Sequence, residues 1–376
     1  MSADPHPKDL GRLIRAAGAG DSELREAVQR LGADATARVV VTELLDRADL
    51  PAADVPLPVT VRFDLRWAGG VVPHVAELSA EPREYAAPAA AAQVVVEQDL
   101  LDAVRGVYGP DAVRRNPSRR IIWTDDTPVS AFSEVPRAAP ATHRLLRGAE
   151  PDRPDLAELI LRMGSDKWGL HYYTQHYDRY LAPLRDLPVV MVEIGVGGFD
   201  HAGVGGGSLH AWSRYFHRGL VYGIDVADKR DVRHPRVTTL QGDQADTGFV
   251  AQVLAETGPP DIVLDDGSHR SADVIASFEL FFPHLRDGGL YFVEDLQTSY
   301  WPGFGGRSDD LNTTVTSMGR LKALVDGLNH EEIGRRAPAP TDRQIRGVHF
   351  HHNLAVVEKG SNAEGSLPPW HPARAQ

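Results

Sequence analysis

The chain has no cysteine among its 376 residues. Disulfides and thiolate metal sites are therefore excluded, and the cytoplasm is the expected compartment. There is also no run of lysine and arginine, and the net charge of −12 argues against a nucleic-acid partner. No apolar stretch approaches the roughly 20 residues of a membrane span, and the first residues show no charged-then-apolar leader. We therefore expect neither a membrane anchor nor a secretory signal.

The length is sufficient for two domains with a core in each. We expect residues 1–150 to form a small α+β domain with an auxiliary or oligomerisation role. Three helices open this domain, and a strictly alternating strand at 59–67 pairs with a second strand near 75–78 in a hairpin. Residues 92–107 are predicted to be helical. The segment 134–155, rich in Pro, Ala and Arg, is predicted to be a linker or a mobile flap.

Residues 151–376 alternate strands with helices, which predicts an α/β domain with a parallel sheet and right-handed crossovers. The strands are expected at 189–194, 221–225, 237–241, 262–264 and 290–293. A final pair of segments within 348–358 is predicted to add to this sheet in antiparallel fashion. Helices are expected between the strands, for example at 209–216 and 272–285.

Two of these strands end in carboxylates. The strand at 262–264 runs into Asp265, Asp266 and, after a glycine and a serine, His269, while the strand at 290–293 runs into Glu294 and Asp295. Neighbouring strands are about 4.8 Å apart, so acids at both ends can share one ion. Carboxylate oxygens suit Mg²⁺, and a histidine beside them can accept a proton. As alternatives, the two aspartates could cap the next helix, and the histidine could be an ordinary surface residue.

A glycine-rich turn follows the strand at 189–194. A dinucleotide fingerprint would need glycine or alanine at position 200, where this chain has Asp200, and Glu193 just before the turn would repel a phosphate. Both features disfavour a nicotinamide oxidoreductase. Asp225 ends the next strand and suits the hydroxyls of a ribose, and Asp243 follows the third strand. S-adenosylmethionine, which has a ribose and a positive end but no phosphate, fits this pattern best.

Longer motifs make the pattern specific. They are Asp-Asp-Gly-Ser-His at 265–269, Glu-Asp at 294–295, Tyr-Trp-Pro-Gly-Phe-Gly-Gly at 300–306, Asp-Ser-Glu-Leu-Arg at 21–25, Thr-Asp-Asp at 124–126 and His-Tyr-Asp-Arg at 176–179. With them the chain resembles the metal-dependent sugar O-methyltransferases of macrolide antibiotic pathways. The resemblance implies a class I Rossmann-like methyltransferase domain with a smaller N-terminal α+β domain, assembled as a homotetramer.

The same resemblance implies roles for individual residues. Magnesium would be held by Asp266, Glu294 and Asp295, and His269 would be the general base. S-adenosylmethionine would be held by Glu193, Gly195, Gly197, Ser208, Asp225, Asp243, Gln244 and Asp266. Thr124 would reach the cofactor of its own or a neighbouring subunit.

The predicted reaction is Mg²⁺-dependent methyl transfer to a hydroxyl of a deoxysugar on a small-molecule glycoside, a glycosylated polyketide of the macrolide kind. A sugar hydroxyl is a poor nucleophile, so a cation and a base both assist it. A catechol-like phenol as acceptor, and a non-catalytic scaffold that binds the cofactor, remain as alternatives. We interpret residues 301–306 as a wall of the acceptor pocket, with a structural loop as the alternative. Tyr173 and Tyr177 are interpreted as helix packing.

Overall fold

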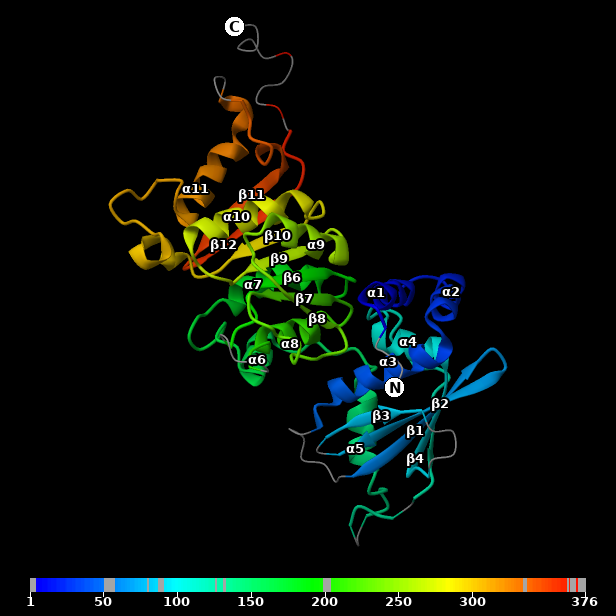
Figure 1. Cartoon of the computed structure of the whole chain (residues 1–376). Helices are drawn as coiled ribbons and strands as arrows, with labels where there is room; N and C mark the ends of the chain where they lie inside the picture. The colour runs from blue at the N-terminus through cyan, green and yellow to red at the C-terminus, as the bar shows by residue number, and fades with distance from the viewer. Residues whose placement is uncertain are drawn as a thin grey trace.

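The computed structural model describes residues 5–50, 58–79, 81–86, 91–125, 127–130, 133–198, 204–333, 337–363, 365 and 370. These residues form two β-sheets, one of five strands and one of seven, each accompanied by helices (Figure 1). Within the described ranges, no helix combines the length and the apolar character that a bilayer crossing requires.

The N-terminal part begins with the three predicted helices. They are α1 (Pro7–Ala16), α2 (Asp21–Leu31) and α3 (Ala33–Ala48). The five-stranded sheet has the order β3-β2-β1-β4-β5. Its strands are β1 (Val59–Trp67), β2 (Gly70–Leu78), β3 (Arg83–Tyr85), β4 (Val94–Asp99) and β5 (Arg120–Trp123). The predicted hairpin is confirmed, because β1 and β2 are antiparallel neighbours joined by a tight turn.

The prediction of a helix at 92–107 is wrong for the first half of this segment. Residues 94–99 form β4, which pairs in parallel with β1, and only then does α4 (Leu100–Tyr108) begin. Three consecutive valines favour the strand, since β-branched side chains pack well on a pleated surface. Asp99 then caps the helix, because its side chain accepts a hydrogen bond from the backbone N–H of Leu101 at 2.9 Å.

The linker or flap predicted at 134–155 is also wrong in part. Its middle is a regular helix, α5 (Ala139–Arg147), whose Leu145 and Leu146 are buried in the core of the N-terminal part. The helix is short and carries its apolar residues as a single pair, so its periodicity is weak in the sequence.

The seven-stranded sheet has the order β11-β12-β10-β9-β6-β7-β8. Its strands are β6 (Val190–Ile194), β7 (Leu220–Asp225), β8 (Val237–Gln241), β9 (Ile262–Asp265), β10 (Leu290–Val293), β11 (Ile345–His351) and β12 (Leu354–Lys359). Strands β6 to β10 are mutually parallel, and β12 joins β10 in antiparallel fashion. The predicted α/β fold, its five parallel strands and the antiparallel addition at the end of the chain are confirmed.

Helices cover both faces of this sheet. The α-helices of this part are α6 (Leu156–Met163), α7 (Thr174–Leu181), α8 (Gly207–Tyr215), α9 (Thr247–Thr257), α10 (Ser271–Phe281) and α11 (Ser317–Leu328). Short 3-10 turns lie at Ala182–Leu184, Phe282–His284, Leu296–Tyr300, Pro302–Phe304, His330–Glu332 and Asp342–Gln344. Side chains that alternate along the strands fall into two buried clusters, one shared with α6 to α8 and the other with α9 to α11.

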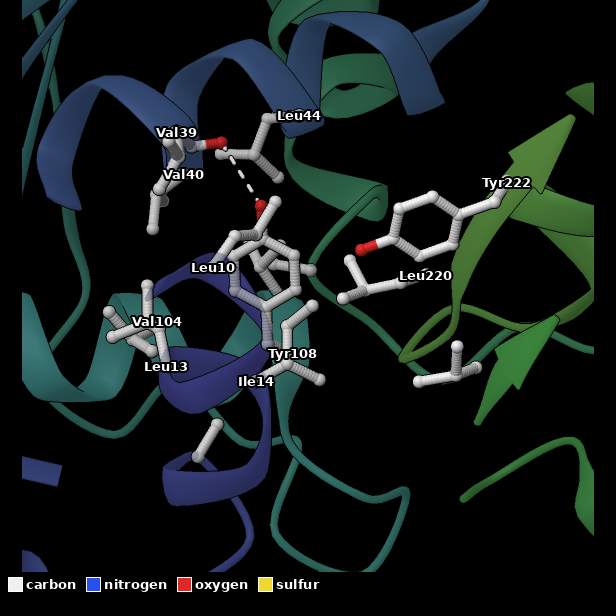
Figure 2. Close-up of a cluster of buried hydrophobic side chains, with 14 of the residues drawn as sticks. Leu10, Leu13, Ile14, Val39, Val40, Leu44, Val104, Tyr108, Leu220 and Tyr222 are labelled. Atoms are coloured by element: carbon white, nitrogen blue, oxygen red, sulfur yellow. Dashed lines mark hydrogen bonds between the residues drawn. The ribbon is translucent and has the colours of Figure 1, made fainter. Parts of the chain in front are cut away.

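The two parts of the chain share one apolar core at their junction. Figure 2 shows Leu220 and Tyr222 of β7 beside Leu10 and Ile14 of α1, with side chains of α3 and α4 around them. The hydroxyl of Tyr108 in α4 donates a hydrogen bond to the carbonyl of Val39 in α3 at 3.3 Å (Figure 2). The N-terminal helices are thus packed directly against β7, the strand next to the edge strand β8 of the seven-stranded sheet.

Candidate functional site

A pocket of about 540 Å³ lies at the carboxyl ends of the parallel strands. Open α/β sheets bind ligands at this edge. The predicted residues that line the pocket are Gly195, Gly197, Ser208, Asp225, Asp243, Gln244, Asp266, His269 and Asp295. Nine predicted residues, which come from strand ends, the turns that follow them and the start of α8, therefore meet around one cavity.

The glycine turn after β6 forms the floor of this pocket. Gly195 has a φ of 90°, and a Cβ there would lie 2.2 Å from the backbone oxygen of Asp266, so only glycine fits. Asp225 stabilises the turn, because its carboxylate accepts a hydrogen bond from the backbone N–H of Val196 at 2.9 Å. Asp200, which departs from the dinucleotide fingerprint, lies outside the described residues.

The two adjacent aspartates after β9 have different environments. Asp265 is 1 % exposed and accepts hydrogen bonds from Ser277 and, at 3.1 Å, from Gln244. Burial raises the pKa of Asp265 to about 6. Asp266 instead contacts Lys167 and lines the pocket. Helix α10 has Arg270 at its N-cap position, with no side-chain cap, so the interpretation of the aspartates as helix caps is wrong.

Asp266, His269 and Asp295 form the core of the site. Each offers one ligand atom, and these atoms all lie within 4.8 Å of one another. The Nε2 atom of His269 is 3.6 Å from Oδ2 of Asp295 and 4.0 Å from Oδ1 of Asp266. His269 and Asp295 both have left-handed backbones, with φ of 56° and 51°. Such strain costs about 1–3 kcal/mol per residue and clusters at functional sites.

Glu294 lies deeper than the other acids. It is 3 % exposed, and its Oε1 accepts hydrogen bonds from the hydroxyl of Tyr177 and from Nζ of Lys167, the latter at 2.9 Å. Burial and the neighbouring charge of Asp266 raise the pKa of Glu294 well above its ordinary value. The described contacts link Glu294 to Asp266 through the shared lysine.

Glu193 lies beneath the glycine turn and does not line the pocket. Its Oε2 accepts a hydrogen bond from the hydroxyl of Ser208 at 2.9 Å, and its Oε1 is 3.5 Å from Nζ of Lys167. That Oε1 is buried and has no hydrogen-bond partner. Burial raises the pKa of Glu193 to about 7. The ion pair with Lys167 at 3.5 Å therefore offsets the charge of this buried oxygen only in part.

Three residues of the site were not predicted as site residues from the sequence: Lys167, His171 and Tyr173, the last of which was interpreted as helix packing. All three come from the irregular segment between α6 and α7, where no periodicity or motif marks them. Tyr173 donates a hydrogen bond to Oδ1 of Asp295 at 2.7 Å, and Nε2 of His171 is 3.6 Å from the same oxygen. Tyr173 and Tyr177 are buried as packing residues, but each also donates to a site carboxylate.

Thr124 follows β5 in the N-terminal part. It is exposed, and its hydroxyl donates a hydrogen bond to the carbonyl of Ala92. Among the described residues, those that line the pocket do not include Thr124.

The charges of the site are unbalanced. Glu193, Asp266, Glu294 and Asp295 carry four carboxylates, and Lys167 supplies one ammonium among them. Such a group of oxygen ligands suits a hard divalent cation. With all four acids ionised, as bound cations favour, the net positive charge of S-adenosylmethionine and the divalent charge of Mg²⁺ would together offset the three negative charges that Lys167 leaves. The donor set therefore fits both groups.

Comparison with known proteins gives the relationship. Residues 10–119 match the family described as MycE methyltransferase N-terminal. The 8-demethyl-8-alpha-L-rhamnosyl tetracenomycin-C 2'-O-methyltransferase of Streptomyces olivaceus is 46% identical over 95% of this chain and 96% of that protein. The demethylmacrocin O-methyltransferase of Streptomyces fradiae is 42% identical over 96% of this chain and 93% of that protein.

A solved structure extends the likeness to three dimensions. The MycE methyltransferase from the mycinamycin pathway, in complex with Mg, SAH and mycinamycin VI, matches with a TM-score of 0.85 and 38% identity. The match covers 97% of this chain and 96% of that one. The chain belongs to the family of sugar O-methyltransferases that modify glycosylated polyketides.

Proposed function

We propose that this protein transfers a methyl group from S-adenosylmethionine to a hydroxyl of a deoxysugar on a glycosylated polyketide, with Mg²⁺ as the required metal. The observation that carries the proposal is the cluster of Asp266, His269 and Asp295 beside the glycine-turn pocket. The cluster combines cation ligands with a proton acceptor at the edge where an α/β sheet binds its cofactor.

The cofactor would occupy the 540 Å³ pocket. S-adenosylmethionine supplies an electrophilic methyl group on its sulfonium. We assign the glycine turn at Gly195 and Gly197 to close backbone approach, Asp225 and Asp243 to the polar edges of the nucleoside, and Gln244 to the shape of the pocket wall. Glu193, with Ser208 fixing one of its oxygens, would balance positive charge on the cofactor.

The metal would be held by Asp266, Glu294 and Asp295. When bound there, Mg²⁺ would supply Lewis-acid activation of a sugar hydroxyl, so that its proton is removed more easily. His269 would accept the proton of the acceptor hydroxyl as its oxygen forms a bond to the methyl carbon and the carbon–sulfur bond breaks, which leaves S-adenosylhomocysteine. Asp266 and Asp295 lie 4.0 Å and 3.6 Å from its Nε2, so the proposed base stands directly beside two of the proposed metal ligands. Tyr173 and His171 hold Asp295 from the opposite side.

We place the acceptor at carbon 2 of the sugar. The relative with 46% identity is named for a 2'-hydroxyl on an α-L-rhamnosyl group. We also propose that residues 301–306 form a wall of the acceptor pocket. Trp301 supports this role, since half of its surface is exposed a few residues beyond Asp295.

We further propose that the protein is a homotetramer that acts in the cytoplasm on a small molecule, with residues 1–150 as an auxiliary and oligomerisation domain. Thr124 would contact the cofactor of a neighbouring subunit, because it is exposed and does not line the pocket of its own chain.

Light scattering measures the number of subunits in the assembly. Thr124→Ala tests the contact, with weaker S-adenosylhomocysteine binding expected only in the assembled protein and unchanged binding contradicting it.

The function is tested with a panel of acceptors. We expect methylation, detected by mass spectrometry, of polyketide glycosides with a free 2-hydroxyl and not of the same glycosides already methylated there. Chelator should abolish turnover, and Mg²⁺ should restore it. Methylation of catechol but of no glycoside would favour a phenol methyltransferase, and full activity after metal removal would contradict the role of the ion.

A further inference from the structure

Lys167 is an almost completely buried ammonium in the middle of the acidic site. Its side chain is 1 % exposed, and its Nζ contacts Asp266, Glu294 and Glu193. Asp266 and Glu294 follow β9 and β10, and Glu193 lies near the end of β6; the three strands are adjacent in the sheet. One side chain from outside the sheet therefore joins all three strand ends.

Because of this contact, the two carboxylate oxygens of Asp266 have different neighbours. Oδ2 accepts a hydrogen bond from Lys167, while Oδ1 is the oxygen that lies 4.0 Å from Nε2 of His269. The Asp266 side chain is 22 % exposed and follows β9 at the pocket, so without a partner it can adopt other rotamers. The bond to Lys167 selects the rotamer in which Oδ1 faces His269 and Asp295.

Glu294 is fixed in a similar way. Its Oε1 accepts hydrogen bonds from Lys167 at 2.9 Å and from Tyr177. Lys167 itself is held in a compact turn, because its carbonyl accepts the backbone N–H of Tyr173 at 3.1 Å. Tyr173 in turn donates to Asp295. A single short segment thus supports all three acids assigned to the metal.

We propose that Lys167 is a positioning residue that orients Asp266 and Glu294 as metal ligands. This inference rests on the proposed function, in which those acids hold Mg²⁺. The opposing view is that Lys167 only balances charge. The two views predict opposite changes in metal affinity when Lys167 is replaced. Removing a nearby positive charge strengthens cation binding by simple electrostatics. Losing a group that orients metal ligands weakens metal binding by about 10- to 100-fold.

The experiment compares the Lys167→Met and Lys359→Met variants with the wild-type protein. Lys359 is a matched control, since it is 6 % exposed but donates to the carbonyls of Phe282 and Pro283, away from the pocket. Binding of Mn²⁺ alone is measured by electron paramagnetic resonance on metal-free protein, and S-adenosylhomocysteine binding by calorimetry. Circular dichroism verifies folding.

We expect Mn²⁺ affinity to fall about 10- to 100-fold in Lys167→Met and to stay within about twofold of wild type in Lys359→Met. Unchanged or tighter Mn²⁺ binding by Lys167→Met would overturn the inference. If the methionine variant does not fold, Lys167→Gln is measured in the same way and judged by the same outcomes. Failure of the wild-type protein to bind Mn²⁺ would instead contradict the proposed function.

Discussion

Two buried clusters of charge in this protein are built in opposite ways. At the junction of the two parts, Glu43 of α3 is fully buried and contacts the guanidinium groups of both Arg236 and Arg47. At the pocket, Glu193, Asp266 and Glu294 share the single ammonium of Lys167. The junction has more positive than negative groups, and the pocket has the reverse.

The pKa values follow this difference. Burial alone would raise the pKa of Glu43, but Arg236 and Arg47 hold it below its usual range. Burial raises the pKa of Glu193 to about 7 and also raises that of Glu294, since one lysine does not compensate them. A cluster that is balanced within the chain stabilises the fold. A cluster left short of positive charge is suited to bind cations, and the pocket is of this kind.

Removing one acid of the pocket should have the largest effect on activity. Asp266→Asn keeps the shape of the side chain but removes a metal ligand, so kcat/KM should fall by about 10³-fold or more. The measurement is methyl transfer at saturating Mg²⁺. The control is Asp228→Asn, a partly exposed acid whose contacts among the described residues are with Arg230. Wild-type turnover by Asp266→Asn would place the ion elsewhere.

Breaking the junction cluster should affect stability and not chemistry. Arg236→Met leaves Glu43 without its main partner in a buried position, which typically costs about 3–5 kcal/mol. Urea unfolding measures the loss, and kcat per folded molecule should stay near wild type at low temperature. A strong loss of kcat without loss of stability would mean that the junction takes part in the reaction.

The proposed base is tested by His269→Ala. Loss of a general base typically lowers the rate by about 10²- to 10⁴-fold, and we expect a value near the lower end because the metal also activates the hydroxyl. The deficit should shrink as pH rises, since hydroxide can replace the base. Turnover at the wild-type rate across the pH range would show that another group accepts the proton.

The smallest predicted effect concerns pH. In the ligand-free protein Glu193 has a pKa of about 7, so it is largely protonated below that pH. A cationic cofactor favours the ionised form, so affinity for S-adenosylmethionine should fall as pH drops below about 7, by at most tenfold per unit. Calorimetry between pH 5.5 and about 8 measures this. Glu193→Gln should remove the dependence, and an identical slope in that variant would assign it to another group.

The same raised pKa has a consequence for the ligand-free protein. The folded state binds this proton more tightly than the unfolded chain, where the ordinary value is 4.5. Glu193 therefore makes the free energy of unfolding decrease as pH rises from about 4.5 through 7. At the junction the sign is reversed, because the lowered pKa of Glu43 contributes stability that is lost only as pH falls below its ordinary range.

The parts of the site that the sequence predicts well are those tied to regular strands. Asp225, Asp266 and Asp295 follow strands whose apolar runs are plain, and the parallel topology then brings their side chains to one edge. Lys167 and Tyr173 come from an irregular segment, and its position depends on tertiary packing that leaves no local pattern. The strand β4 was missed for a related reason, because six residues read equally well as the start of the helix that follows.

The central claim is that the acids after β9 and β10 converge on one cation beside the cofactor pocket. The most direct measurement is a crystal structure of the protein with Mn²⁺ and S-adenosylhomocysteine, using anomalous scattering to locate the metal. The account predicts one strong peak within about 2.0–2.3 Å of carboxylate oxygens from Asp266, Glu294 and Asp295. A fully occupied cofactor pocket without such a peak, or with the metal bound elsewhere, would contradict it.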